Sequence, residues 1–204
     1  MYLVKEITAV GSGDRVIVKL EGDGEQALVT VAPEVLLHHG IKKGDCVSEE
    51  LYSELSQTAE LEGAVRKGLS ILGYGMNSVA RLEEKLRRHG YSAEIASRAA
   101  EELVSRGYLD EENDALRLCD SMISKKYGSR KILIALRNRG YSRSVIRRAE
   151  EFLSEIDFSE VCESLIRTKI KKLPENRDET KKLIAKLTAL GYNVGEIRTA
   201  LERF

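Results

Sequence analysis

The sequence predicts a mainly α-helical protein, in which a small N-terminal β-meander module precedes a tandem array of three three-helix units with an elongated, curved shape. Two observations lead to this prediction. A Gly-Tyr dipeptide recurs with its glycines at Gly90, Gly140 and Gly191, spaced by 50 and 51 residues. Apolar and polar residues alternate between glycine-containing turns over residues 1–31, a pattern typical of short antiparallel strands.

The sequence around each repeated glycine indicates two helices joined by a turn. Apolar residues lie four and eight positions before it, and nine and thirteen positions after it. A spacing of four places side chains on one helix face, and glycine readily adopts the left-handed conformation that ends a helix. The tyrosine after each glycine is expected to supply the apolar contact of the cap. The matching residues are Leu86, Leu136 and Leu187; Leu82, Ile132 and Leu183; Ala99, Ala149 and Ala200; and Leu103, Leu153 and Phe204.

Three strands are predicted at the N-terminus, over residues 3–10, 15–20 and 27–31. The turns between them contain the Gly-x-Gly sequences of residues 11–13 and 22–24. A strand follows each of these sequences, whereas a phosphate-binding loop leads into a helix. A sheet this small needs a cover to be stable, and the helix described next is the candidate for that cover.

Helix signals begin directly after the third strand. A short helix is predicted over residues 33–39, because Pro33 suits a first helical position and Gly40 suits a stop. Ser48 is the expected cap of a long helical stretch. No linker rich in proline or serine separates the β module from the helical array near residues 60–63, so we expect a helix to join them.

Four segments follow from these boundaries: a β module with a short helix and a connecting helix at 1–62, and three-helix repeats at 63–112, 113–157 and 158–204. Pro174 lies where the third repeat requires a connection between helices. The helices of the repeats are expected at about residues 64–72, 78–88 and 93–106; 113–126, 130–139 and 143–154; and 158–172, 178–189 and 194–203.

Composition limits the classes of protein that fit. The chain has 204 residues, of which 42% are hydrophobic, so it can bury a core, and no apolar run reaches the length of a membrane span. The first residues lack a cleavable signal pattern, and we therefore expect a cytoplasmic monomer without a membrane partner. Cys46, Cys119 and Cys162 are far apart and odd in number, so they are interpreted as buried or half-buried thiols.

The net charge of zero conceals a division along the chain. Residues 1–63 carry 5 Lys and Arg against 12 Asp and Glu, whereas residues 64–204 carry 28 against 21. The helical part is therefore expected to meet an acidic partner, either nucleic acid or an acidic protein surface.

The strongest chemical pattern is the basic stretch of residues 125–149, which contains nine Lys and Arg residues and no acidic residue. Like charges three or four positions apart on a helix repel, so phosphate or carboxylate groups of a partner are the expected counter-charge. The alternative is a solvated basic face balanced by Glu150, Glu151 and the acidic β module. A further basic surface lies around Arg167, Lys169, Lys171 and Lys172. The candidate partner-binding residues are Lys125, Lys126, Arg130, Lys131, Arg137, Arg139, Arg143, Arg147 and Arg148.

No pattern in the sequence indicates catalysis, a cofactor or a metal site. The acidic cluster of Asp110, Glu111, Glu112 and Asp114 is better explained by capping of a helix start and by the helix dipole. The histidines lack the spacing of a zinc motif, and no Ser or Cys is arranged with a base as a nucleophile would be. We therefore expect a protein that is not an enzyme.

Several segments, taken in order, resemble the bacterial regulatory protein RecX family, whose members modulate the RecA recombinase. They are residues 85–92 (KLRRHGYS), 107–112 (GYLDEE), 128–132 (GSRKI) and 136–140 (LRNRG). The N-terminal part resembles the extension of members from Gram-positive lineages, through residues 41–45 (IKKGD) followed by Glu49 and Glu50. The chain departs from the family at residues 74–78, where it retains only the capping Ser78, and at Asp114 and Ala115.

This resemblance implies a non-enzymatic protein that lies in the groove of the RecA–DNA filament and lowers its ATPase and strand-exchange activities. Single- or double-stranded DNA is a further candidate partner, on account of the basic stretch. A general nucleic-acid-binding protein built of helix-turn-helix-like units is the alternative, since two helices joined by a glycine turn also describe that motif. Against it, only the second repeat places arginines, Arg143 and Arg147, near the start of its third helix.

Overall fold

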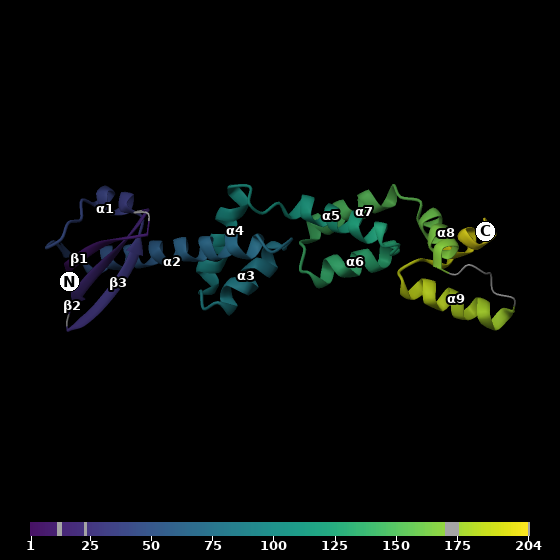
Figure 1. The fold of residues 1–204 in the computed structure, drawn as a ribbon, viewed down its shortest axis with the longest axis horizontal. Coiled ribbons are helices and arrows are strands. Elements are labelled where there is room, and N and C mark those ends of the chain that lie inside the picture. Colours follow the sequence, from purple (N-terminus) through teal and green to yellow (C-terminus); the bar gives the residue numbers. More distant parts are fainter. Residues whose placement is uncertain (12–13, 23, 170–175, 204) are drawn as a thin grey trace. The chain divides into compact units, whose positions relative to one another are not determined.

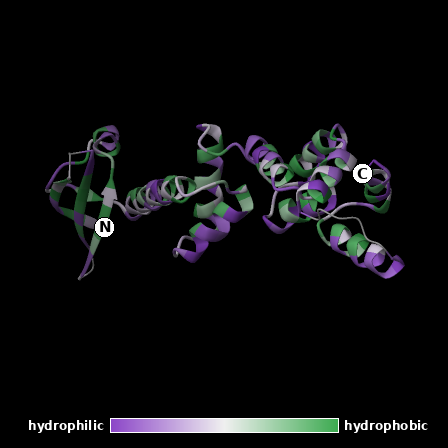
Figure 2. Ribbon diagram, turned by 45° about the vertical axis from the view of Figure 1, so that its right-hand side comes forward, coloured by the Kyte–Doolittle hydropathy of each residue, from purple (hydrophilic) through white to green (hydrophobic). Residues whose placement is uncertain are grey.

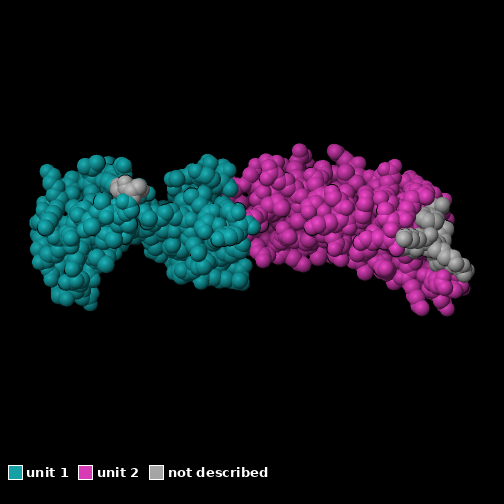
Figure 3. All heavy atoms as spheres, viewed as in Figure 1, with its two compact units in different colours: residues 1–74, 83–108 teal, residues 75–82, 109–204 magenta. Residues whose placement is uncertain are grey.

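In the computed structural model, the protein is predominantly helical with a small antiparallel sheet at the N-terminus, so the predicted mainly α-helical class with an N-terminal β module is confirmed (Figure 1). The structure describes residues 1–11, 14–22, 24–169 and 176–203. It divides into two compact units, Met1–Tyr74 with Glu83–Tyr108, and Gly75–Leu82 with Leu109–Phe204 (Figure 3). The four-segment domain division remains a prediction.

The sheet contains the three predicted strands and a short fourth one. Strands β1 (Tyr2–Val10), β2 (Arg15–Gly22) and β3 (Glu25–Val31) lie in the order β3-β2-β1-β4, and all neighbouring pairs are antiparallel. The sequence did not predict β4 (Cys46–Val47), which pairs with Tyr2 and Leu3. A two-residue strand is too short to show a period of two, so only its pairing reveals it.

One face of the sheet forms the core of the N-terminal module. Every second residue of β2 is buried, including Val16, Val18 and Leu20. Leu36 of helix α1 (Pro33–His39) and Leu55 of helix α2 (Glu49–Leu72) belong to the same buried cluster. The predicted short helix and the start of the long helix therefore provide the cover that a small sheet requires.

Helix α2 connects the sheet to the first repeat without a break. Its cap is Ser48, whose Oγ accepts a hydrogen bond from the backbone N–H of Leu51 at 3.2 Å. The helix continues through residues 60–63 to Leu72, which confirms the predicted helical joint. The separate helix predicted over residues 64–72 is instead the last part of α2, which packs against α4 (Ala93–Ser105).

The remaining helices follow the predicted plan within a few residues. In the second and third repeats the first helix packs against the third, α5 against α7 and α8 against α10. Hydrophobic and hydrophilic residues both occur along the helices, as expected of amphipathic elements (Figure 2). Residues 170–172 of a predicted helix, Pro174 and Phe204 lie outside the described residues. The helices are α3 (Val79–Arg88), α5 (Glu111–Ser124), α6 (Ser129–Asn138), α7 (Arg143–Ser154), α8 (Phe158–Lys169), α9 (Arg177–Ala189) and α10 (Val194–Glu202).

The repeated glycines end helices in the predicted left-handed conformation. Gly90, Gly140 and Gly191 have φ angles of 96°, 75° and 100°. The tyrosine after each donates its backbone N–H to the leucine carbonyl five residues earlier, at 3.3 Å in all three cases. This is the hydrogen bond of a Schellman cap. Gly107, with φ 73°, ends α4 in the same way, although it lies outside the 50-residue spacing.

The ends of successive repeats join through their second helices. Ser78, directly before α3, donates from Oγ to the carbonyl of Arg139 at the end of α6, at 2.6 Å. Gly128, directly before α6, donates from its backbone N–H to the carbonyl of Leu190 at the end of α9, at 2.9 Å. Both contacts lie within the second compact unit. The carbonyl end of one helix thus meets the amino end of the helix before it, which aligns their dipoles favourably.

No helix within residues 1–11, 14–22, 24–169 and 176–203 combines the length and apolar character needed to cross a membrane.

Candidate partner-binding surface

The nine predicted residues lie on the end of α5, on α6 and on α7, which we call the basic hairpin. Seven of them are exposed, and Lys126 and Lys131 are half-buried. Lys125 follows α5, Arg139 follows α6, and the others lie on α6, on α7 or in the turn before α6. Lys126 has a φ of 63°, which is unusual for a residue with a side chain. The hairpin therefore exposes most of its positive charge to solvent.

Local carboxylates neutralise two of these arginines. Arg137 pairs with Glu150 at 3.2 Å. Arg148 pairs with Glu112 at 3.2 Å and with Glu151 at 3.1 Å, and these hydrogen bonds raise the pKa of Arg148. This part of the hairpin fits the alternative interpretation, in which neighbouring acids balance the basic face.

The other exposed cations of the hairpin are available to a partner. Within the part of the chain that the structure describes, no carboxylate forms an ion pair with Lys125, Arg130, Arg139, Arg143 or Arg147. Arg130 also shares a face of α6 with Ile134, a large apolar side chain that is 53% exposed. Guanidinium groups beside an exposed apolar side chain suit contact with a folded partner.

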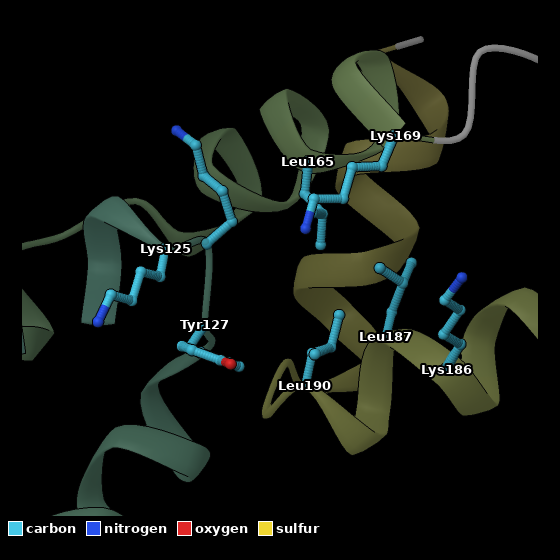
Figure 4. A pocket seen from close by; sticks show the side chains of 8 residues that line it. Lys125, Tyr127, Leu165, Lys169, Lys186, Leu187 and Leu190 are labelled. Atoms are coloured by element: carbon cyan, nitrogen blue, oxygen red, sulfur yellow. The ribbon is translucent and has the colours of Figure 1, made fainter. Parts of the chain in front are cut away.

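A pocket of about 250 Å³ opens beside the hairpin, and we call it the lysine pocket (Figure 4). Leu165, Leu187 and Leu190 lie together on one side of it, and Tyr127 faces them from the other. Lysines from three places in the sequence surround these apolar residues. They are Lys125 and Lys126 after α5, Lys169 at the end of α8 and Lys186 on α9.

Sequence reasoning found only part of the lysine pocket. Lys125 and Lys126 belong to the predicted surface, whereas Lys169 was assigned to a separate surface around Arg167. The sequence did not indicate a role for Lys186. The position of Lys186, five residues before Gly191, could have indicated such a role, since Lys85 holds the same position before Gly90. The other two members of that separate surface, Lys171 and Lys172, lie outside the described residues.

The first compact unit contains a second basic hollow, between α2 and α3. Its volume is about 330 Å³, and Lys85 contributes to its lining at the position that Lys186 holds in the lysine pocket. Tyr74, which is 92% exposed, and Ile71 supply the apolar part. Cations beside an aromatic ring therefore occur in two repeats.

Known proteins match this chain over most of its length, although no family model matches. The regulatory protein RecX of Caldanaerobacter subterraneus subsp. tengcongensis is 27% identical over 179 residues, which cover 88% of this chain and 89% of that protein. The regulatory protein RecX of Leuconostoc citreum is 28% identical over 69% of this chain and 51% of its own, longer chain. Over most of its length the chain is therefore similar to proteins named regulatory protein RecX.

A solved structure agrees with this similarity at the level of the fold. The crystal structure described as regulatory protein RecX has a TM-score of 0.77 and covers 99% of this chain and 100% of its own. Its sequence identity is 22%, so it supports the fold alone. The curated relatives are named regulatory proteins.

The acidic residues near the start of α5 have structural roles. Asp110 caps α5 by accepting from the backbone N–H of Asn113 at 3.0 Å, and this hydrogen bond lowers the pKa of Asp110. Glu111 accepts from the backbone N–H of Val79 at 3.1 Å. Among the residues with described positions, no three His, Cys, Asp or Glu side chains are grouped as a metal site would require.

The cysteines correct one prediction. Cys119 and Cys162 are buried, and burial raises the pKa of each thiol to about 11. Cys46 is exposed instead of buried or half-buried. It lies in β4 at the edge of the sheet, where alternate side chains point away from the core, and its neighbour Val47 is the buried one.

Proposed function

We propose that this chain is a non-enzymatic regulator that binds the RecA recombinase filament and lowers its ATPase and strand-exchange activities during recombination and DNA repair. Similarity to proteins named regulatory protein RecX supports the regulatory role. The observation that carries the proposal is the set of exposed cations on the basic hairpin that no described carboxylate neutralises. A filament of protein and nucleic acid offers both carboxylate and phosphate groups as counter-charges.

The physical basis of the proposed binding is the arginine-rich face of α6 and α7. A guanidinium group forms paired hydrogen bonds with either carboxylate or phosphate. Arg139, Arg143 and Arg147 are exposed and can make such contacts without first breaking an ion pair with a described carboxylate. Ile134 adds apolar contact area that a bare phosphate backbone would not use. A partner that combines protein with nucleic acid matches both features.

Charge reversal on the hairpin tests this proposal. The structure favours the double variant Arg139→Glu with Arg147→Glu over any change at Arg137, because Arg137 already pairs with Glu150. The Arg139 carbonyl that accepts from Ser78 belongs to the backbone and remains. Each lost contact is worth up to about 1 kcal/mol and reversal about doubles it, so filament affinity should fall about a hundredfold. Inhibition of the RecA ATPase measures the effect.

The matched control is Lys43→Glu with Arg98→Glu, which changes the net charge equally at exposed positions outside the hairpin. This control should inhibit like the unchanged protein, and circular dichroism melting should show that both double variants fold. If the hairpin variant melts normally and inhibits at the original concentration, the partner surface lies elsewhere.

A further inference from the structure

The lysine pocket concentrates positive charge without a counter-charge on the protein. No carboxylate of residues 1–11, 14–22, 24–169 or 176–203 forms an ion pair with Lys125, Lys126, Lys169 or Lys186. All four lysines line one hollow of about 250 Å³. Figure 4 shows the Lys169 ammonium group directed into the hollow and those of Lys125 and Lys186 at its outer edges, where an anion in the hollow would attract them. The hollow is too small for a folded partner, and its volume lies just below that of typical small-ligand sites.

We propose that the lysine pocket binds a compact polyphosphate, in the form of the phosphate chain of a nucleoside triphosphate. Lysine ammonium groups bind phosphate as point charges, and several of them suit a ligand with several charges on adjacent phosphates. A single nucleic-acid strand instead spreads one charge per phosphate along an extended backbone. The concentration of four lysines around one hollow therefore favours a polyphosphate over a strand.

The apolar part of the pocket provides a place for the base. Tyr127 faces Leu190 and Leu187 across the hollow (Figure 4). A nucleobase stacks favourably on an aromatic ring, whereas a bare phosphate gains nothing from one. Leu165 and Leu187 are buried, so this side of the pocket is held by the core of the third repeat.

The turn that supplies two of the lysines is anchored to the third repeat. The hydroxyl of Tyr192 donates to the carbonyl of Lys126 at 2.8 Å. Lys126 has a φ of 63°, a conformation that persists only where surrounding contacts maintain it. The pocket is thus organised before a ligand arrives, which lowers the entropic cost of binding.

Isothermal titration calorimetry on the full chain tests the inference without RecA, so the result does not depend on the proposed function. The probes are ATP, inorganic tripolyphosphate and adenosine. ATP should bind saturably at one site, tripolyphosphate about tenfold more weakly because base stacking is lost, and adenosine not measurably. If ATP and tripolyphosphate bind with equal affinity, the pocket binds the polyphosphate, and the proposed stacking of the base on Tyr127 is wrong.

Charge reversal locates the binding. Lys169→Glu with Lys186→Glu should weaken ATP binding by about a hundredfold, since each substitution replaces an attraction by a repulsion. The matched control, Arg177→Glu with Lys182→Glu, alters exposed cations of α9 that do not line the pocket and should leave ATP affinity unchanged. Circular dichroism melting confirms that each variant folds.

Three results would overturn the proposal. They are the absence of saturable binding of ATP and tripolyphosphate, an unchanged affinity in the pocket variant, and tighter binding of a single-stranded oligothymidylate than of ATP with the same loss in that variant. The last result would identify a site for a nucleic-acid strand. Measuring both ATP binding and RecA inhibition on each variant distinguishes the polyphosphate proposal from the proposed function. The hairpin variant should keep ATP binding, and the pocket variant should keep inhibition of RecA.

Discussion

Tyr141 and Tyr192 occupy the same position in successive repeats, yet their hydroxyl groups have different environments. Both rings are buried, and burial raises the pKa of each phenol. The Tyr192 hydroxyl donates to the Lys126 carbonyl at 2.8 Å. The Tyr141 hydroxyl is buried and has no hydrogen-bond partner among the described residues. One position in the repeat therefore carries a satisfied polar group and an unsatisfied one.

Replacing each tyrosine by phenylalanine should have opposite consequences. Tyr192→Phe leaves the Lys126 carbonyl without its partner and should lower the free energy of unfolding by about 1 kcal/mol. Tyr141→Phe removes a group that costs free energy to bury and should be neutral or stabilising. Urea denaturation of the two variants measures the difference. Equal destabilisation would show that the Tyr141 hydroxyl has a partner in solution.

The three cysteines should differ in their rates of reaction with a thiol reagent. At pH 8 a thiol-specific reagent should modify Cys46 quickly, while Cys119 and Cys162 react only after unfolding, because they are buried with pKa values raised to about 11. The unfolded thiols ionise at their ordinary, lower pKa, so the free energy of unfolding should fall as pH rises from there towards about 11.

Mass spectrometry of the modified native protein counts the reactive thiols, and protein unfolded in urea provides the control with all three accessible. Modification of two or three cysteines in the native state would contradict the burial of Cys119 and Cys162.

At the scale of the helix, the same cap is used with different surroundings. Gly90 and Gly191 both end the second helix of a repeat with positive φ. A β-carbon on Gly90 would meet nothing within 4 Å, whereas one on Gly191 would lie 2.5 Å from the backbone nitrogen of Lys131. The glycine of the third repeat therefore serves both the cap and the close approach of two helix ends, and that of the first repeat serves the cap alone.

Alanine substitution should separate these two roles. Gly90→Ala should cost about 1 kcal/mol, the price of positive φ for a residue with a side chain. Gly191→Ala should cost more, about 3 kcal/mol or above, because the backbone of α6 must also move away. Thermal melts of the two variants test this order. Similar melting temperatures would mean that α6 can move away from the end of α9 at little cost in free energy.

The junction between α3 and α6 makes a related prediction. Ser78 donates to the Arg139 carbonyl and also accepts from the backbone N–H of Arg81 at 3.2 Å. Ser142 caps α7 by accepting from the backbone N–H of Val145, and it makes no hydrogen bond to another repeat among the described residues. Ser78→Ala should therefore destabilise by about 2 kcal/mol and Ser142→Ala by about 1 kcal/mol. Chemical denaturation under the same conditions compares them, and a larger loss for Ser142→Ala would reject the junction.

At the scale of the whole molecule, charge is distributed in segments, with acidic residues concentrated before residue 64 and basic residues after it. The cations of the basic hairpin lie on the second helical repeat, and the lysine pocket lies between the second and third repeats. A protein held only by phosphates should lose affinity for bare DNA and for a RecA filament with the same dependence on salt. A regulator that also contacts filament protein should show different salt dependences of its affinities for the two partners.

A salt titration distinguishes these alternatives. We expect a shallower dependence of log affinity on log salt concentration for the filament than for bare DNA, because Ile134 and other protein contacts are less sensitive to screening. Fluorescence anisotropy with both partners over the same salt range measures it. Identical slopes would favour the general nucleic-acid-binding alternative.

Patterns within the sequence were sufficient to predict most helices, strands and helix caps of this protein. The Gly-Tyr spacing located the caps at Gly90, Gly140 and Gly191, and Pro33 and Gly40 bounded α1. Helix periodicity, strand alternation and turn chemistry depend on residues a few positions apart, so a single sequence displays them. The density of Lys and Arg over residues 125–149 was visible for the same reason.

Contacts between groups far apart in the sequence became visible in the folded protein. The tertiary structure placed Glu150 beside Arg137, brought Lys186 to the pocket of Lys125, and set Gly128 against the end of α9. These contacts depend on how helices of different repeats pack, and the chain carries no local pattern that encodes the pairing. Close packing at the junction of α6 and α9 requires glycine. The lysine pocket lies beside this junction, so it results from the stacking of the second and third repeats.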